Sequence, residues 1–305
     1  MREIGGSTHV TYPSGEVSGR SPVLLSAPLD GGYGIVTHAT PFHPLDPSWP
    51  DQPADSGLIQ AEGMELKVAD CLTGAVPLDP GPGSGVAGDA ERILLGADIP
   101  VRRGEGGWAW LVVHVVERHV PESAEALLFV DPVRRRALSA GHTACHVTAL
   151  ALNAALAPRW REPARTDGLG RPDFDALAIV SSRIVERGSR DVYRVGRSLR
   201  RAGFTAEGLA DDLPGITATM NGLLASWVAA DAPVRIDAPS PELAARRTWR
   251  CDLPEGTVEM PCGGTHLDRL GELASVTASL ELSPEGDELV VETRATGPAL
   301  SGEWR

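Results

Sequence analysis

Two short motifs of metal-binding residues lie far apart in this chain, and any fold that uses both must bring them together. The first is HxxxH, formed by His142 and His146, and the second is CxxxH, formed by Cys262 and His266. Residues four apart share one face of a helix, so both histidines can point at one ion. The glycines after Cys262 allow a tight turn that brings its sulfur toward His266. Three nitrogens and one sulfur are a ligand set that zinc accepts, so the sequence predicts a Zn2+ site.

Each motif alone is a weak signal. An isolated HxxxH is more often a pair of unrelated histidines, and we expect Cys145, between the two histidines, to be a core thiol. None of the other five histidines has a histidine or cysteine four residues away. The spacing lacks the paired cysteines of a zinc finger and the glutamate of HExxH metalloproteases. The two motifs together therefore indicate a zinc site of another kind.

Composition limits the class of protein. The chain has 305 residues, of which 42% are hydrophobic and 23% charged, which is typical of a soluble protein of one large domain or two. It has no apolar run long enough for a transmembrane helix and no signal-peptide pattern at its start. Four cysteines do not suggest a disulfide framework in a chain of this length. We expect a cytoplasmic protein with no membrane partner.

The hydrophobic pattern predicts an α+β fold in two domains, residues 1–127 and 128–305. The first contains short apolar stretches separated by glycine and proline, which favours a small β-barrel. Pro77–Gly88 is expected to be a surface loop or a linker. In the second domain, His142–Leu156 is expected to be a buried helix that ends before Pro158.

Four further elements are expected after that helix. Asp191–Ala202 is interpreted as an exposed basic helix ended by Gly203, and Gly215–Ala230 as an amphipathic helix preceded by Pro214. A strand and a hairpin complete the second domain, at Thr257–Met260 and at Val276–Leu282 with Glu288–Thr293.

The net charge of −13 argues against a general nucleic-acid binder. The charge is nevertheless uneven, because one stretch concentrates arginines: Arg183, Arg187, Arg190, Arg194, Arg197, Arg200 and Arg201. These arginines form either ordinary solvated faces or a local basic surface on an acidic protein.

Three stretches resemble the alanyl-tRNA editing proteins, free-standing relatives of the editing domain of alanyl-tRNA synthetase. Leu128–Arg136 with Gly141–His146 is similar to the family's entry into its metal helix, and Pro261–His266 with Gly271 and Glu272 is similar to its "CGGTH … GE" motif. The third stretch resembles part of the family's N-terminal barrel, at Ala39–Pro44 and Asp51–Gly57. Asp191–Arg201 also resembles a basic helix of some members.

The resemblance implies a trans-editing hydrolase that cleaves the ester joining serine, or glycine, to alanine tRNA. Zinc would be held by His142, His146, Cys262 and His266, of which Cys262 or His266 is expected to be loose, because catalytic zinc keeps an open position. Thr143 and Thr265 would orient water or the substrate amine, unless their hydroxyls only stabilise local turns. Substrate contacts would come from Gln52, Gly263 and Gly264, and the arginines from Arg183 to Arg201 would hold the tRNA acceptor stem.

One departure from the family pattern leaves the substrate open. The glycine triplet that usually precedes the glutamine reads Trp49-Pro50-Asp51 here. A stiff, bulky loop at this place is compatible with a zinc hydrolase of the same fold acting on another aminoacyl-tRNA or acyl ester. A non-catalytic tRNA-binding module with a structural zinc is the third hypothesis, and it predicts no turnover.

Overall fold

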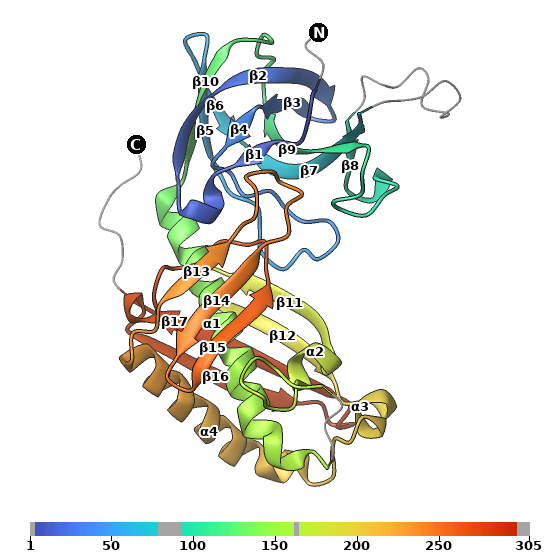
Figure 1. Ribbon diagram of the computed structural model, residues 1–305, viewed down its shortest axis with the longest axis vertical. Helices are drawn as coiled ribbons and strands as arrows, with labels where there is room; N and C mark the ends of the chain where they lie inside the picture. Colours follow the sequence, from blue (N-terminus) through green and yellow to red (C-terminus); the bar gives the residue numbers. More distant parts are fainter. Residues whose placement is uncertain (1–3, 79–92, 162–164, 298–305) are drawn as a thin grey trace.

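The computed structural model describes residues 4–78, 93–161 and 165–297, which form an α+β structure with mostly antiparallel sheets (Figure 1). Most of the predicted loop Pro77–Gly88 lies outside the described residues. The helices of the described part are α1 (Pro132–Leu156), α2 (Phe174–Ala178), α3 (Arg197–Arg201) and α4 (Leu209–Ala229). None of them is long and apolar enough to cross a membrane.

The N-terminal half contains one large curled antiparallel sheet and a two-stranded parallel sheet of β1 (His9–Val10) and β4 (Ala39–Thr40). The following strands belong to the large sheet. Its strands, in spatial order, are β6 (Met64–Val68), β5 (Gly57–Ala61), β10 (Glu125–Val130), β2 (Ser18–Leu29), β3 (Gly32–Thr37), β9 (Trp108–Val116), β7 (Asp70–Pro77) and β8 (Leu94–Leu95). Strands β6 and β7 are separated only by Ala69, which donates its N–H to Val115 O at 2.8 Å. Because β6 pairs with β5 and β7 pairs with β9, the sheet curls back on itself.

The C-terminal half contains two smaller antiparallel sheets. One has the order β11 (Ile179–Val185), β12 (Gly188–Arg194), β17 (Glu288–Thr296) and β16 (Ser275–Leu282), and the other contains β13 (Val234–Asp237), β14 (Thr248–Leu253) and β15 (Gly256–Pro261). A single hydrophobic core joins both sheets to α1 and α4. The predicted strand at Thr257–Met260 and the C-terminal hairpin are confirmed.

Helix α1 begins earlier than predicted and runs down the middle of the C-terminal half (Figure 1). The Asp131 side chain accepts the N–H groups of Val133 and Arg134, and Pro132 occupies the first helical position, so the helix starts there rather than at His142. It ends at Leu156, as predicted. A Cβ on Gly141 would collide with the backbone at Gly188, so the glycine lets the β11–β12 turn approach the helix.

The predicted basic helix Asp191–Ala202 is wrong over its first half. Asp191–Arg194 belongs to β12, and only Arg197–Arg201 is helical. Arg190 and Arg194 are four residues apart, a spacing that puts two side chains on one face of a helix and also on one face of a strand. The buried residues Val192 and Tyr193, a β-branched and an aromatic side chain, favour the strand.

Helix α4 also starts before its predicted boundary, and Pro214 lies inside it. Leu209 is buried on the same stripe as Ile216, Met220, Leu224 and Trp227, and this packing outweighs the hydrogen bond that proline cannot make.

Several contacts join the two halves of the chain. The segment between β13 and β14 reaches the N-terminal sheet, where Val10 donates to Pro241 O and Leu243 donates to Thr8 O, both at 2.8 Å. On α1, Arg135 forms a buried ion pair with Asp55. These contacts connect residues on the two sides of position 127. The division into domains 1–127 and 128–305 stays a prediction.

Candidate metal centre

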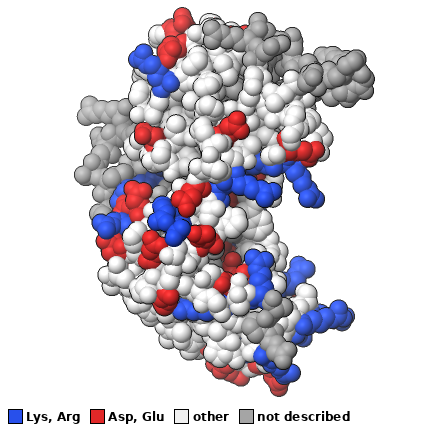
Figure 2. All heavy atoms as spheres, in the orientation of Figure 1, with Lys and Arg blue, Asp and Glu red and all other residues white. Residues whose placement is uncertain are grey.

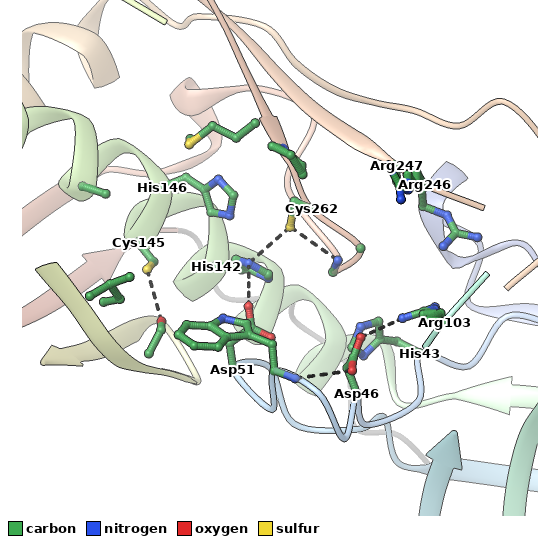
Figure 3. Close-up of a pocket in the computed structure, with 18 of the residues that line it drawn as sticks. His43, Asp46, Asp51, Arg103, His142, Cys145, His146, Arg246, Arg247 and Cys262 are labelled. Carbon is green, nitrogen blue, oxygen red and sulfur yellow. Dashed lines mark hydrogen bonds and ion pairs between the residues drawn. The ribbon is translucent and has the colours of Figure 1, made fainter. Parts of the chain in front are cut away.

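The two distant motifs meet where α1 faces the loop after β15. The ligand atoms of His142, His146, Cys262 and His266 all lie within 4.8 Å of one another. Cys262 Sγ lies 3.5 Å from His142 Nε2 (Figure 3). It lies 3.2 Å from His266 Nε2. Zinc bonds of about 2.3 Å to sulfur and about 2.0 Å to nitrogen would place neighbouring tetrahedral ligand atoms roughly 3.5 Å apart. The cluster could therefore hold a metal ion such as zinc.

Gln52 fixes which nitrogen of His142 faces the cluster. Its Oε1 lies 2.7 Å from His142 Nδ1 and accepts the Thr265 backbone N–H at 2.9 Å. A backbone N–H can only donate, so the atom it meets is the amide oxygen, and His142 Nδ1 must carry the hydrogen. The lone pair of His142 is then on Nε2, the atom beside Cys262 Sγ. Such a partner orients a metal-binding histidine and raises its basicity.

Thr143 holds His266 in a similar way. Its Oγ1 accepts the Leu267 backbone N–H at 3.1 Å and lies 3.2 Å from His266 Nδ1. With Nδ1–H donating to the hydroxyl, Nε2 of His266 is left free on the side of Cys262. Thr143 thus contacts one candidate ligand, His266, and directly follows another, His142, in the sequence.

Thr265 is buried beneath the cluster. Its hydroxyl oxygen accepts Gln52 Nε2–H at 3.0 Å and Ser139 O–H at 2.8 Å. Gln52, Thr143 and Thr265 are all at most 3% exposed, and none of them lines the neighbouring cleft. Their contacts are those of residues that position the ligands, and the predicted catalytic and substrate roles stay predictions.

The two glycines of the ligand loop differ in their surroundings. A methyl group on Gly264 would overlap the His142 imidazole and lie 2.7 Å from Gln52 Oε1, whereas one on Gly263 would meet nothing within 4 Å. Gly264 therefore allows the loop to pack directly on His142. Both glycines line the cleft, as substrate-contacting residues would.

Burial sets the protonation of the four candidate ligands. It lowers the pKa of His146 to about 4, and it holds the pKa values of His142 and His266 well below the ordinary value. Neutral imidazole is the form that binds metals. Burial also raises the pKa of the Cys262 thiol to about 12, so metal binding must displace its proton. His146 Nδ1 is buried and has no hydrogen-bond partner within the described ranges, an orphaned atom that is consistent with a ligand.

A cleft of about 620 Å³ opens beside the cluster (Figure 3). The candidate metal ligands His142, His146 and Cys262 line this cleft, whereas His266 does not. Residues of both halves of the chain form the rest of its wall. Asp51 is one of these, and its Oδ2 lies 3.7 Å from His142 Nε2. The sequence pointed to Gln52 but gave no separate signal for Asp51, whose place depends on how the loop before β5 folds over α1.

Cys145 is a wall residue of the cleft rather than the core thiol that we predicted. Its Sγ lies 3.5 Å from Asp191 Oδ2, and Asp191 also accepts the hydroxyl groups of Ser182 at 2.5 Å and Ser189 at 2.7 Å. No arginine or lysine of the described segments forms an ion pair with Asp191. This end of the cleft is therefore acidic.

The predicted tRNA-binding arginines lie on several elements rather than on one helix. Arg183, Arg187, Arg190 and Arg194 belong to β11, β12 and their turn, and Arg197, Arg200 and Arg201 belong to α3. All except Arg187 are exposed, and none of them lines the cleft. Figure 2 shows basic side chains above and below the hollow on one side of the molecule.

Comparison of the sequence with protein-family models found no match, and a search of curated proteins found no similar protein. A functional assignment therefore depends on the geometry of the metal cluster and its cleft.

Proposed function

We propose that the protein is a trans-editing hydrolase that removes a wrongly attached amino acid, serine or glycine, from alanine tRNA. The observation that carries this proposal is the meeting of the HxxxH and CxxxH motifs beside an open cleft, with the imidazoles of His142 and His266 held by Gln52 and Thr143. In this proposal, the curled N-terminal sheet and the C-terminal half are the barrel and the editing domain of the alanyl-tRNA editing proteins.

The reaction would add water across the ester and release the amino acid from the tRNA 3′ end. Zinc, when bound, supplies a Lewis acid that polarises a carbonyl oxygen and acidifies water. Gln52 and Thr143 keep the donor nitrogens aimed at the cluster. Gly263 leaves room for substrate in the adjoining cleft, and Gly264 leaves room for the His142 imidazole beside it. The Asp51 carboxylate, at the edge of the cluster, is placed to accept a proton from the attacking water.

The tRNA body would lie against the exposed arginines of α3 and of the β11–β12 hairpin. Phosphate contacts position a nucleic acid without reading its sequence, which suits a surface outside the catalytic cleft. The acidic remainder of the chain would limit general nucleic-acid binding.

A second candidate function is hydrolysis of another aminoacyl ester by the same centre. Trp49 lines the cleft and is 43% exposed, where the resemblance leads us to expect glycine. An indole at this position changes the shape of the substrate site, so the amino acid or the nucleotide that it accepts can differ from the family's.

The deciding experiment is release of labelled serine from serine-charged alanine tRNA, with alanine-charged tRNA as the control. Wild type is compared with Asp51→Asn and with Cys262→Ala, and zinc content is measured for each. We expect rapid release of serine, sparing of alanine, a zinc-replete but slow Asp51→Asn variant and an inactive Cys262→Ala variant. Zinc-loaded wild type that releases no amino acid from a panel of aminoacyl-tRNAs would contradict the proposal and favour a structural zinc.

A further inference from the structure

His146 differs from the other two candidate ligand histidines in how its ring is held. Gln52 contacts Nδ1 of His142, and Thr143 contacts Nδ1 of His266. The Nδ1 atom of His146 is buried and has no hydrogen-bond partner among the residues that the structure describes. A hydrogen bond to the second ring nitrogen is the usual device that orients a metal-binding histidine. No described side chain holds the His146 ring through that atom.

The indole of Trp249 packs against the His146 ring. The two ring centroids are 4.8 Å apart with their planes at 45°, and the His266 ring centroid is 6.0 Å from the same indole. Tilted aromatic rings attract one another at such separations. Trp249 is 0% exposed and belongs to the core of the C-terminal half, so its neighbours keep the indole in one place. A fixed indole limits the rotation of the imidazole that packs on it.

Strand β14 places this indole beside the ligand loop. Buried and half-buried side chains alternate along the strand, and Trp249 is a buried member that pairs with Met260 of β15. Strand β15 leads directly to Cys262, whose N–H donates to the backbone carbonyl of Arg247 at 3.1 Å. The indole and the first residue of the ligand loop therefore belong to one hydrogen-bonded hairpin.

Packing alone holds the indole. Its Nε1–H is buried and meets no hydrogen-bond partner within the described ranges. An unpaired buried donor disfavours folding, so hydrogen bonding gives no reason for an indole at this position. The face of the ring, which meets the imidazoles, is the part that can act on the cluster. Phenylalanine would keep an aromatic face and remove the unpaired donor, whereas leucine would remove the aromatic face.

We propose that Trp249 is a positioning residue of the metal centre. Its ring does for His146 what Gln52 and Thr143 do for the other two histidines, and it keeps the imidazole turned toward the cluster. The inference concerns metal binding and does not depend on the deacylase reaction.

The test measures zinc affinity by competition with a chromogenic chelator. Trp249→Leu should weaken zinc binding roughly 10- to 100-fold, the usual loss when a group that orients a metal ligand is removed. Trp249→Phe should retain most of the affinity, because an aromatic ring remains. Trp110→Leu is the matched control, since Trp110 is also buried with an unpaired Nε1–H but lies in the core of the N-terminal sheet. It should lower the midpoint of thermal unfolding and leave the zinc affinity unchanged.

A double-mutant cycle shows whether Trp249 acts through His146. His146→Ala removes the candidate ligand, so Trp249→Leu in that background should weaken zinc binding little further. Additive losses would overturn the positioning role, and so would a Trp249→Leu variant with the affinity of wild type. The cobalt(II) absorption spectrum gives a second readout. A displaced ligand changes the shape of the ligand-field bands, whereas a smaller folded fraction only reduces their height.

Intrinsic fluorescence keeps the proposal testable if Trp249→Leu does not fold. Zinc should change the emission of wild type and of Trp110→Phe, and Trp249→Phe should lack this change because it has no indole against the imidazoles. An undiminished zinc response in Trp249→Phe would overturn the proposal. Wild type that binds no zinc would overturn both this role and the proposed function. Zinc binding that depends on Trp249, in a protein that hydrolyses no aminoacyl ester, would support the role and refute the deacylase.

Discussion

The amide oxygen of Gln52 lies 2.7 Å from Nδ1 of His142, so a residue of the loop before β5 orients a candidate metal ligand on α1. We expect Gln52→Ala to weaken zinc binding roughly 10- to 100-fold, because His142 would lose the acceptor that selects its tautomer. Competition with a chromogenic chelator measures this affinity. Gln60→Ala, which removes a half-buried glutamine of β5 far from the cluster in the sequence, is the matched control and should bind zinc as wild type does.

Gly264 and Gly263 provide a matched pair of substitutions. Gly264→Ala should lose zinc and lower the free energy of unfolding by about 1–3 kcal/mol, because its methyl group would overlap the His142 imidazole. Gly263→Ala meets open space and should retain both zinc and stability. Metal analysis and thermal unfolding of the two variants check this, and equal behaviour would show that the loop does not pack on His142 as described.

Arg135 and Asp55 should make a large contribution to stability. Arg135 donates to Asp55 and to Pro41 O, and both charged side chains are at most 5% exposed. Arg135→Ala would leave the Asp55 carboxylate buried without its cation, at a cost of about 3–5 kcal/mol in urea unfolding. Arg20→Ala, at an exposed position of β2, should change stability by no more than about 0.5 kcal/mol.

Asp175 should make stability depend on pH. Burial raises its pKa from 3.8 to about 6, so the folded protein holds this proton more tightly than the unfolded chain does. Its contribution is most favourable below about pH 4 and is lost as the pH rises through 6. Asp175→Asn keeps an acceptor for the Tyr193 hydroxyl and should stabilise the protein at pH 7.5 by about 1–2 kcal/mol, since partial exposure reduces the full effect.

Urea unfolding at a series of pH values between 4.5 and 7.5 measures this contribution. The gain from Asp175→Asn should shrink as the pH falls. Asp30→Asn, in the exposed β2–β3 turn, is the control. A constant difference between Asp175→Asn and wild type would contradict the assignment.

Arg197 on α3 tests the predicted tRNA surface. Arg197→Glu reverses a charge on an exposed helix and should weaken tRNA binding roughly tenfold at low salt, with zinc content unchanged. Arg118→Glu reverses an exposed charge outside this surface and should have little effect. Filter binding at two salt concentrations distinguishes these outcomes, and equal affinities would remove α3 from the tRNA site.

The candidate metal ligands were predictable because their signals are local. His142 and His146 are one helical turn apart, and the glycines between Cys262 and His266 allow a tight turn, so short segments already carry the geometry. The end of α1 and the C-terminal hairpin were predictable for the same reason, through Pro158 and the turn around Gly286.

Long-range contacts account for what the sequence did not reveal. Gln52 was singled out as a substrate contact, but its role toward His142 depends on residues that meet only in the folded chain. Asp51, Arg103 and Arg247 carry no motif, because their place in the cleft is set by loops folding over a distant helix. The arginine spacing in β12 is compatible with a helix and with a strand, and only the pairing with β17 decides between them.

Helix α1 carries Arg135 at the end that meets the N-terminal sheet and His142 two turns further along. An α-helix bends little along its length, so a displacement of the N-terminal sheet that moves Arg135 would also move the imidazoles of His142 and His146 on the same helix. The zinc affinity is therefore a sensitive reporter of the junction between the halves. By the same linkage, occupancy of the centre should slow amide hydrogen exchange in the first turns of α1, at a distance from any ligand.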